Sequence, residues 1–274
     1  AIGSSALTAL TSGIGNLAIG YQAMDANETS DYNLAIGESA LGALTKDGSA
    51  NNLAIGYEAG LTLTVGASNI LIGRNALKLA AVGESFNIAI GQDAMSGADA
   101  GSAGTIDYNI AIGQDALTGG DLVDSTAKLE KCIAIGANTL NSTAQTLNAG
   151  NTAQTGTIAI GHDALTALTT GAGNVAIGYQ ALMAEGGGSR NIAIGYGAMD
   201  AAANGEDDNI AIGYSALGNL NEAGSDNNMA IGNQAGAGMG TIGGLDNVFI
   251  GLNAGGGTWV TAASNYNIAI GNSS

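Results

Sequence analysis

The sequence has no proline and only one cysteine, one histidine and one tryptophan among its 274 residues. Proline removes a backbone donor, so its absence is typical of a chain whose amides are needed for pairing with strands on both sides. A single cysteine excludes an internal disulfide, and without a cysteine pair or a histidine cluster no zinc site can be assigned. We therefore expect neither a disulfide framework nor a metal-dependent enzyme.

Positive charge is scarce as well, with six Lys or Arg residues against 23 Asp or Glu, a formal net charge of -17 and a pI near 4.1. Phosphate backbones and anionic membranes repel such a chain, so we expect no nucleic acid and no membrane as partner. No apolar run approaches the roughly 20 residues of a membrane-spanning helix. The chain starts within a repeat, without an initiator Met, and we expect it to be a fragment of a longer fibre.

Glycine is abundant, with 46 residues, and much of it belongs to one repeated phrase. The stretch "NLAIGYQAM" at 16–24 returns as "NVAIGYQAL" at 174–182 and "NIAIGYSAL" at 209–217. An Ile-Gly pair marks fifteen copies, spaced 17 to 25 residues apart, with the longest intervals in the middle of the chain. Repeats of this length indicate a stacked architecture and not a catalytic domain.

Positions within one copy are counted from its asparagine, which is position 1. Position 2 is Ile or a substitute, position 3 is usually Ala and position 4 is Ile. This two-residue period predicts a strand with one aliphatic face and one small face. We expect the Ile face to point inward and the alanines to form a stripe where neighbouring rods approach. The glycine at position 5 should bend the strand, and positions 8 and 9, Ala followed by Leu or Met, should begin a second short strand.

The predicted fold class is all-β, an elongated parallel β-solenoid or β-roll of about fifteen coils, with residues 1–274 forming one repeat array. The asparagines at position 1 should line up along the axis, where their amides can bond one another or neighbouring backbones. Cys132 takes this position in its copy, and we expect it to be a small, half-buried residue.

The "NIAIG" phrases resemble the repeats of trimeric autotransporter adhesin heads of the YadA type, and the fuller phrase "NVAIGYQAL" is similar to repeats of phage tail fibres. The resemblance covers essentially the whole chain. It implies a left-handed β-roll, a homotrimer and attachment to a host surface. The period of 17 to 25 residues exceeds that of the adhesin heads, and no heptad stalk or membrane anchor is present, which favours a fibre of phage type.

Aromatic and acidic side chains recur at fixed places in the repeat. The tyrosines follow the phrase glycine or precede its asparagine, at Tyr21, Tyr57, Tyr179, Tyr196 and Tyr214 and at Tyr32, Tyr108 and Tyr266. We expect these rings to cover the corners of the solenoid with their hydroxyls in water, although a ladder that stacks on a glycan is an alternative. Acidic clusters such as "GEDDN" at 205–209 are expected to be turn carboxylates, with calcium ligands as the alternative that the sequence leaves open. We assign no metal site and predict no cofactor.

For catalysis the sequence offers little, because His162 beside Asp163 is its one histidine and no nucleophile elbow or phosphate loop is present. We predict that the chain is not an enzyme. A polysaccharide depolymerase with paired carboxylates across a subunit groove is the third hypothesis.

Binding is expected in the longest inserts, at 96–108, 118–131 and 141–156, because insertions in repeat arrays map to loops that often make contacts. These loops either meet a receptor or lock neighbouring subunits together. The candidate receptor-contact residues are Asp121, Asp124, Lys128, Lys131, Asn151 and Trp259.

The predicted function is a structural and adhesive fibre segment, the trimeric shaft or head of a tail fibre or cell-surface adhesin. Its partners would be its own copies and a host surface glycan or protein receptor, and its location extracellular or on the virion surface. The alternative is a purely architectural, self-assembling extracellular filament.

Overall fold

The computed structural model describes residues 1–45, 47–80, 83–98, 105–119, 128–141, 155–202, 205–242, 244–257 and 265–274. They fall into two compact units. Unit 1 holds the described residues from Ala1 to Ala137, and unit 2 holds those from Asn138 to Ser274.

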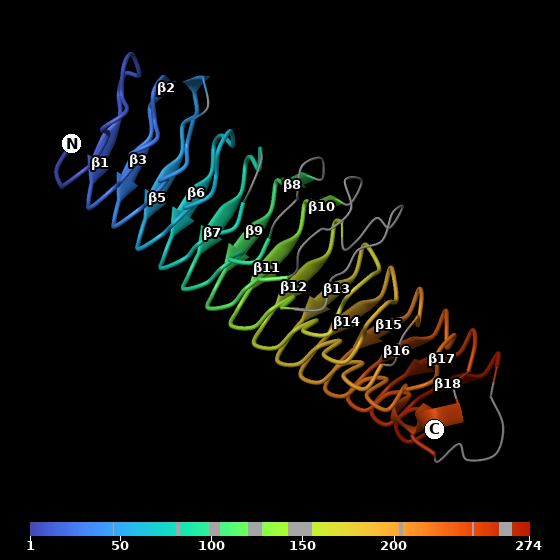
Figure 1. Ribbon diagram of the computed structural model, residues 1–274. Helices are drawn as coiled ribbons and strands as arrows, with labels where there is room; N and C mark the ends of the chain where they lie inside the picture. The colour runs from blue at the N-terminus through green and yellow to red at the C-terminus, as the bar shows by residue number, and fades with distance from the viewer. Residues whose placement is uncertain are drawn as a thin grey trace. The chain divides into compact units, whose positions relative to one another are not determined.

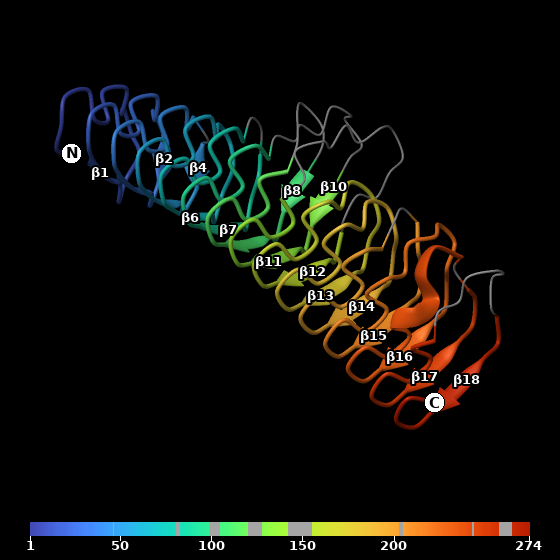
Figure 2. The ribbon, with the colours of Figure 1, turned by 90° about the horizontal axis from the view of Figure 1, so that it is seen from below.

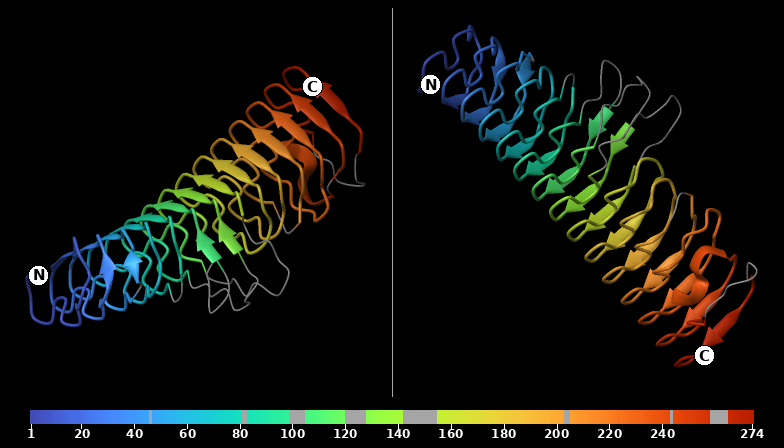
Figure 3. Two further views of the ribbon diagram at one scale, coloured as in Figure 1. Left: turned by 90° about the horizontal axis from the view of Figure 1, so that it is seen from above. Right: turned by 60° about the horizontal axis from the view of Figure 1, so that its bottom comes forward.

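Unit 1 is a parallel β-solenoid in which each repeat after the first contributes one three-residue strand to a common sheet, and the first adds an isolated bridge from Ile2 to Ile19 (Figures 1 and 3). The strands pair in chain order and in the register of the repeat, so that Ala18 lies opposite Ala35 and Ala35 opposite Ala54. The strands are β1 (Leu17–Ile19), β3 (Leu34–Ile36), β5 (Leu53–Ile55), β6 (Ile70–Ile72), β7 (Ile88–Ile90), β9 (Ile110–Ile112) and β11 (Ile133–Ile135).

Two small parallel sheets supplement the main sheet of unit 1. One pairs β2 (Ser30–Asp31) with β4 (Gly48–Ser49), and the other pairs β8 (Thr105–Asp107) with β10 (Lys128–Glu130). The second sheet joins the ends of two long inserts that were expected to be loops, and it buries Ile106 and Leu129. The sequence prediction missed it because a single strand of three residues carries no clear periodic signal.

Unit 2 repeats the architecture, again with parallel strands in repeat register. In both units the strands lie along one side of the loops and the chain returns on the other side (Figure 2). The strands are β12 (Ile158–Ile160), β13 (Val175–Ile177), β14 (Ile192–Ile194), β15 (Ile210–Ile212), β16 (Met229–Ile231), β17 (Val248–Ile250) and β18 (Ile268–Ile270), and a 3-10 helix, η1, spans Ala237–Ile242. The predicted all-β parallel solenoid is confirmed in each unit, whereas the number of coils, the handedness and the trimer stay predictions.

The orientation predicted for the strands is wrong. Ala193 at position 3 is completely buried, whereas Ile192 and Ile194 on either side of it are only half-buried, and the same pattern recurs from strand to strand. Away from the terminal rungs, the interior is already occupied by the buried Leu or Met of position 9 and the buried asparagine of position 1. A coil this narrow has room for a methyl group opposite them, so the larger Ile side chains point outward.

Two exceptions show how tightly the interior is filled. Leu71 and Phe249 replace the alanine at position 3, and both are fully buried. A Cβ added to Gly60 would lie 2.8 Å from Leu71, and one added to Gly236 would lie 2.9 Å from Phe249. Glycine therefore replaces the usual Leu or Met at position 9 of the preceding rung, which leaves room for the larger side chain.

The glycine at position 5 is confirmed as an obligatory bend. Gly178 has a φ of +139°, and an added Cβ would overlap the carbonyl oxygen of Gly195 in the next rung. The predicted second strand at positions 8 and 9 is wrong, because Gln180 and Leu182 have φ near +50° and the segment forms turns. These turns bond to the neighbouring rungs as a strand would, as when the Leu182 N–H donates to the Ala198 carbonyl at 2.9 Å.

The predicted asparagine ladder is confirmed in both units. In unit 2 the Oδ1 atom of Asn174 accepts from the backbone N–H of Asn191 at 2.9 Å and from its Nδ2 at 3.2 Å. The Nδ2 atom of Asn191 also donates to the Glu206 carbonyl at 2.6 Å. These bonds satisfy amides buried in the core, as burial of polar groups requires.

Cys132 takes the asparagine position in its copy. It is fully buried and not half-buried as expected, and its N–H donates to Asn109 Oδ1 at 3.0 Å.

Candidate interaction surfaces

The outward-facing Ile side chains form one continuous surface on each unit, called here the Ile face, made of positions 2 and 4 of the strands. None of these residues is buried in the described strands of either unit. The most exposed away from the chain ends are Leu17 at 41%, Ile70 at 37% and Ile231 and Ile250 at 36% each. Successive rungs repeat the surface at the strand spacing of about 4.8 Å.

The Ile face is apolar and repeats from rung to rung. In unit 1 it comprises fourteen aliphatic side chains on the strands of the main sheet, none of them buried. The face contains no charged side chain, because every position on it is Ile, Leu, Val or Met. A contiguous exposed apolar surface of this kind is a candidate for protein association.

A ladder of stacked rings follows the phrase glycines of unit 2. His162, Tyr179, Tyr196 and Tyr214 stack in sequence, with ring centroids 5.6, 5.0 and 5.6 Å apart. In unit 1, Phe86 stacks on Tyr108 at 4.9 Å. As expected, the rings cover the corners of the repeat, and Tyr196 and Tyr214 are about half exposed. Because each ring face inside the ladder is covered by the next ring, the ladder offers edges and hydroxyls, and not open faces on which a sugar could stack.

The acidic clusters are used largely within the fold. Asp207 Oδ1 accepts from the Ser189 N–H at 2.7 Å, and Asp208 forms two parallel hydrogen bonds of 2.7 Å with Arg190. Asp107 Oδ1 accepts from the Ser85 N–H at 2.8 Å; burial raises the pKa of this carboxyl, and the hydrogen bond opposes the rise. Across the described residues, no group of three or more His, Cys, Asp or Glu side chains is placed to hold a metal ion.

The histidine is part of the ladder and lies beside a carboxylate. His162 Nδ1 lies 2.9 Å from Asp163 Oδ2, and half of the imidazole side chain is exposed. The ring stacks on Tyr179.

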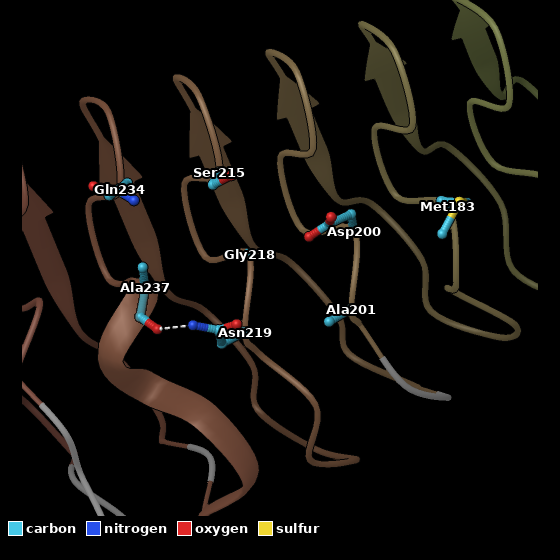
Figure 4. A pocket seen from close by; sticks show the side chains of 8 residues that line it. All are labelled: Met183, Asp200, Ala201, Ser215, Gly218, Asn219, Gln234 and Ala237. Carbon is cyan, nitrogen blue, oxygen red and sulfur yellow. Dashed lines mark hydrogen bonds between the residues drawn. The ribbon is translucent and has the colours of Figure 1, made fainter.

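A polar groove lies on the turn side of unit 2 and was not predicted. It has a volume of about 450 Å³ and is lined by Met183, Asp200, Ala201, Ser215, Gly218, Asn219, Gln234 and Ala237 (Figure 4). The Asn219 Nδ2 atom donates to the Ala237 carbonyl at 2.6 Å and so fixes one wall. Burial raises the pKa of the Asp200 carboxyl, and hydrogen bonds from the backbone N–H groups of Asp200 and Ala201 partly offset the rise.

Most of the candidate receptor-contact residues lie outside the described residues. These are Asp121, Asp124, Asn151 and Trp259. Lys128 is the first residue of β10, where its backbone lies opposite Thr105. Lys131 has a φ of +60° and an exposed side chain, and its ammonium group lies 4.0 Å from Glu130 Oε2. Lys128 begins β10 and Lys131 follows its last residue, so the two lysines lie at opposite ends of this strand, and the structure defines no site there.

Comparisons of the chain with protein-family models, curated proteins and solved structures gave no match. Within the described part of the chain, no helix combines the length and hydropathy needed to cross a membrane. The resemblance to trimeric fibre repeats therefore stays a prediction, and the surfaces described above carry the functional argument.

Proposed function

We propose that this chain is a structural and adhesive fibre segment, a homotrimeric shaft or head that attaches to a host surface glycan or protein and lies outside the cell or on a virion. The observation that carries the proposal is the Ile face. Its two columns of aliphatic side chains repeat on every strand of the main sheet in both units, and they are partly exposed to water in a single copy. The proposal includes no enzyme activity and no cofactor.

A second copy of the same chain is the occupant that fits the Ile face. The face is uncharged and regular at the strand spacing, and an identical face offers the same spacing and the same apolar chemistry. The net charge of -17 makes two copies repel, and the Ile face carries none of the charged side chains responsible, so repulsion is weaker there than on the charged surfaces. Association through the Ile face would bury the exposed halves of the Ile side chains and extend the thin alanine core with a second apolar layer.

The test is the mass of the particle in solution, measured by sedimentation equilibrium. A trimer has three times the 26.6 kDa of the chain. In the double variant Val248→Glu with Ile250→Glu, two charges enter the face within β17. We expect the mass to fall to that of one chain, because unpaired charges are costly to bury.

Leu252 supplies a matched control, because it is in the same rung, is 50% exposed and lies beyond Gly251, off the Ile face. Leu252→Glu adds a charge and removes an exposed aliphatic side chain without touching the face. It should leave the mass of the complex unchanged. A wild-type chain that sediments as a monomer at all concentrations would refute the proposal.

A further inference from the structure

The groove of unit 2 has a counterpart in unit 1, and the comparison shows how the groove arises. The segment "AMDA" is followed one rung later by "SALG" at 23–26 and 39–42, and again at 198–201 and 215–218. In both places the aspartate lies over the glycine of the next rung. An added Cβ would be 3.7 Å from Asp25 Oδ1 at Gly42 and 3.3 Å from Asp200 Oδ1 at Gly218.

The two places differ in the side chains that surround the aspartate. In unit 1, Leu61 of the following rung covers Gly42, with Leu61 Cδ1 3.3 Å from the position of an added Cβ. In unit 2 the same repeat position holds Ala237, which leaves the space open. Position 7 beside the aspartate changes from Gln22 to Gly197. Both units thus share the aspartate that lies over a glycine, and the groove is open in unit 2 because smaller residues surround this pair.

One polar group of the groove is absent from the corresponding place in unit 1. Asn219 takes the place of Ala43, and its side chain is held by the Ala237 carbonyl. The Ser215 hydroxyl and the Gln234 amide line the groove on neighbouring rungs (Figure 4). Asp200 is desolvated enough for its pKa to be raised. A carboxylate, a hydroxyl and two amides therefore converge on one space, with Met183 and the alanines as the apolar part of its wall.

We propose that this groove binds a short neutral saccharide of about one or two sugar residues, a size that suits a cavity in the usual range for small-molecule sites. Carboxylate and amide side chains accept from and donate to the neighbouring hydroxyls of a sugar ring. Met183, Asp200, Gly218 and Ala237 occupy the same position of successive rungs. The lining residues at this position therefore follow one another at about 4.8 Å along the groove.

Charge narrows the class of ligand. None of the residues that line the groove is cationic, and Asp200 is its one carboxylate. An acidic sugar would meet this carboxylate and the negative field of the chain without a compensating cation. A divalent cation prefers six or more oxygen ligands with several carboxylates, which the lining residues do not supply. A neutral polyol satisfies the hydrogen-bonding groups without either cost.

This inference rests on the proposed function, attachment to a host surface, and adds to it the class of ligand and the place where that ligand binds. The groove uses positions 7, 10 and 11 of the repeat, whereas the Ile face uses positions 2 and 4. Saccharide binding can therefore be measured on the wild-type chain and on the Val248→Glu, Ile250→Glu variant. If the wild-type chain binds saccharide but stays monomeric, the proposed trimer is refuted and the proposed saccharide site stands. If it forms a trimer but binds no saccharide, the site is refuted and the trimer stands.

The experiment begins with a printed array of neutral oligosaccharides built from glucose, galactose, mannose and N-acetylhexosamines, with sialylated forms of the same glycans as the anionic set. The strongest neutral hit is then titrated calorimetrically into the 274-residue chain. Ala237→Leu recreates the arrangement around Leu61, and Asp200→Asn removes the charge. We expect either change to weaken binding about tenfold or more.

Asp25→Asn in unit 1 is the matched control, and it should change the affinity by less than about twofold. Circular dichroism and thermal unfolding establish that each variant is folded; if Ala237→Leu does not fold, Asp200→Asn and Ser215→Ala still decide the question. The proposal is overturned if no neutral glycan binds at concentrations up to about 10 mM. It is also overturned if only sialylated glycans bind, or if Asp25→Asn weakens binding as much as Asp200→Asn.

Discussion

Asn191 and Asn209 are joined through a single oxygen atom: Oδ1 of Asn191 accepts from both the backbone N–H of Asn209, at 3.0 Å, and its Nδ2, at 3.2 Å. Both side chains are fully buried. The same pair of bonds links most neighbouring asparagines of the ladder, so each rung fixes the register of the next. The ladder is polar yet lies in the core, and its stability depends on complete pairing.

Replacement of Asn191 by Ala should therefore be costly. It removes the acceptor of the Asn209 N–H and the Asn191 donor to the Glu206 carbonyl, and it leaves the Asn209 Nδ2 with only its bond to the Ser225 carbonyl. Since each buried polar group left unpaired costs about 1–3 kcal/mol, we expect the free energy of unfolding to fall by about 3 kcal/mol. Urea unfolding followed by circular dichroism measures it. A loss below about 1 kcal/mol would mean that water replaces the amide and that the ladder is not a major source of stability.

The inward alanines and outward Ile residues can be distinguished by mutation. Ala193→Leu should destabilise the chain by about 3 kcal/mol, because the interior opposite it is filled by Leu182 of the preceding rung. Adding Leu182→Gly should recover part of the loss, since Leu71 and Phe249 are accommodated by glycine in the same way. Ile194→Ala on the outer face should cost the isolated chain less than about 1 kcal/mol. Equal costs at 193 and 194 would contradict the orientation.

The bend glycines should not tolerate a side chain. Gly178→Ala places a methyl group against the Gly195 carbonyl at a φ of +139°, and we expect loss of the folded state or a destabilisation above about 4 kcal/mol. Gly173→Asn is the matched control: its φ is +70°, and Arg190, Asp208 and Asn227 occupy the same repeat position at φ near +60°. Thermal unfolding of this variant should be unchanged or slightly raised.

Stability should fall in acid where Asp208 is protonated. Its two hydrogen bonds from Arg190 lower the pKa of the carboxyl in the folded state. Its contribution is therefore present above the unfolded pKa of about 3.9 and is lost as the pH falls through the lower folded value. Unfolding midpoints of wild type and Arg190→Gln should differ at pH 6 and converge near pH 2. Arg190→Lys, which keeps the charge but not the paired bonds, should lie between them; a gap that stays constant with pH would contradict the assignment.

The strand and its bend could be predicted from the repeat because their requirements are local. Each Ile-Gly pair marks a strand that ends at a residue with φ near +135°, a conformation open to glycine alone. The asparagine ladder follows from stacking equal phrases in register. The turns at positions 8 and 9 could not be predicted, since Leu182 and Met199 adopt left-handed φ values that their residue types disfavour. The contacts of each rung with the next impose them.

By itself, the sequence determined that this chain stacks: one phrase repeated fifteen times, with glycine at each bend and no proline, admits a parallel solenoid and little else. It did not determine which side of the strand is inside, because an alternation of large and small residues is the same pattern read from either face. The tertiary structure decided this, since the side chains opposite the strand leave room for Ala193 and not for Ile194. It also decided the groove, because Ala237 opens a space beside Asp200 only when three rungs are stacked and Leu61 closes the corresponding space in unit 1.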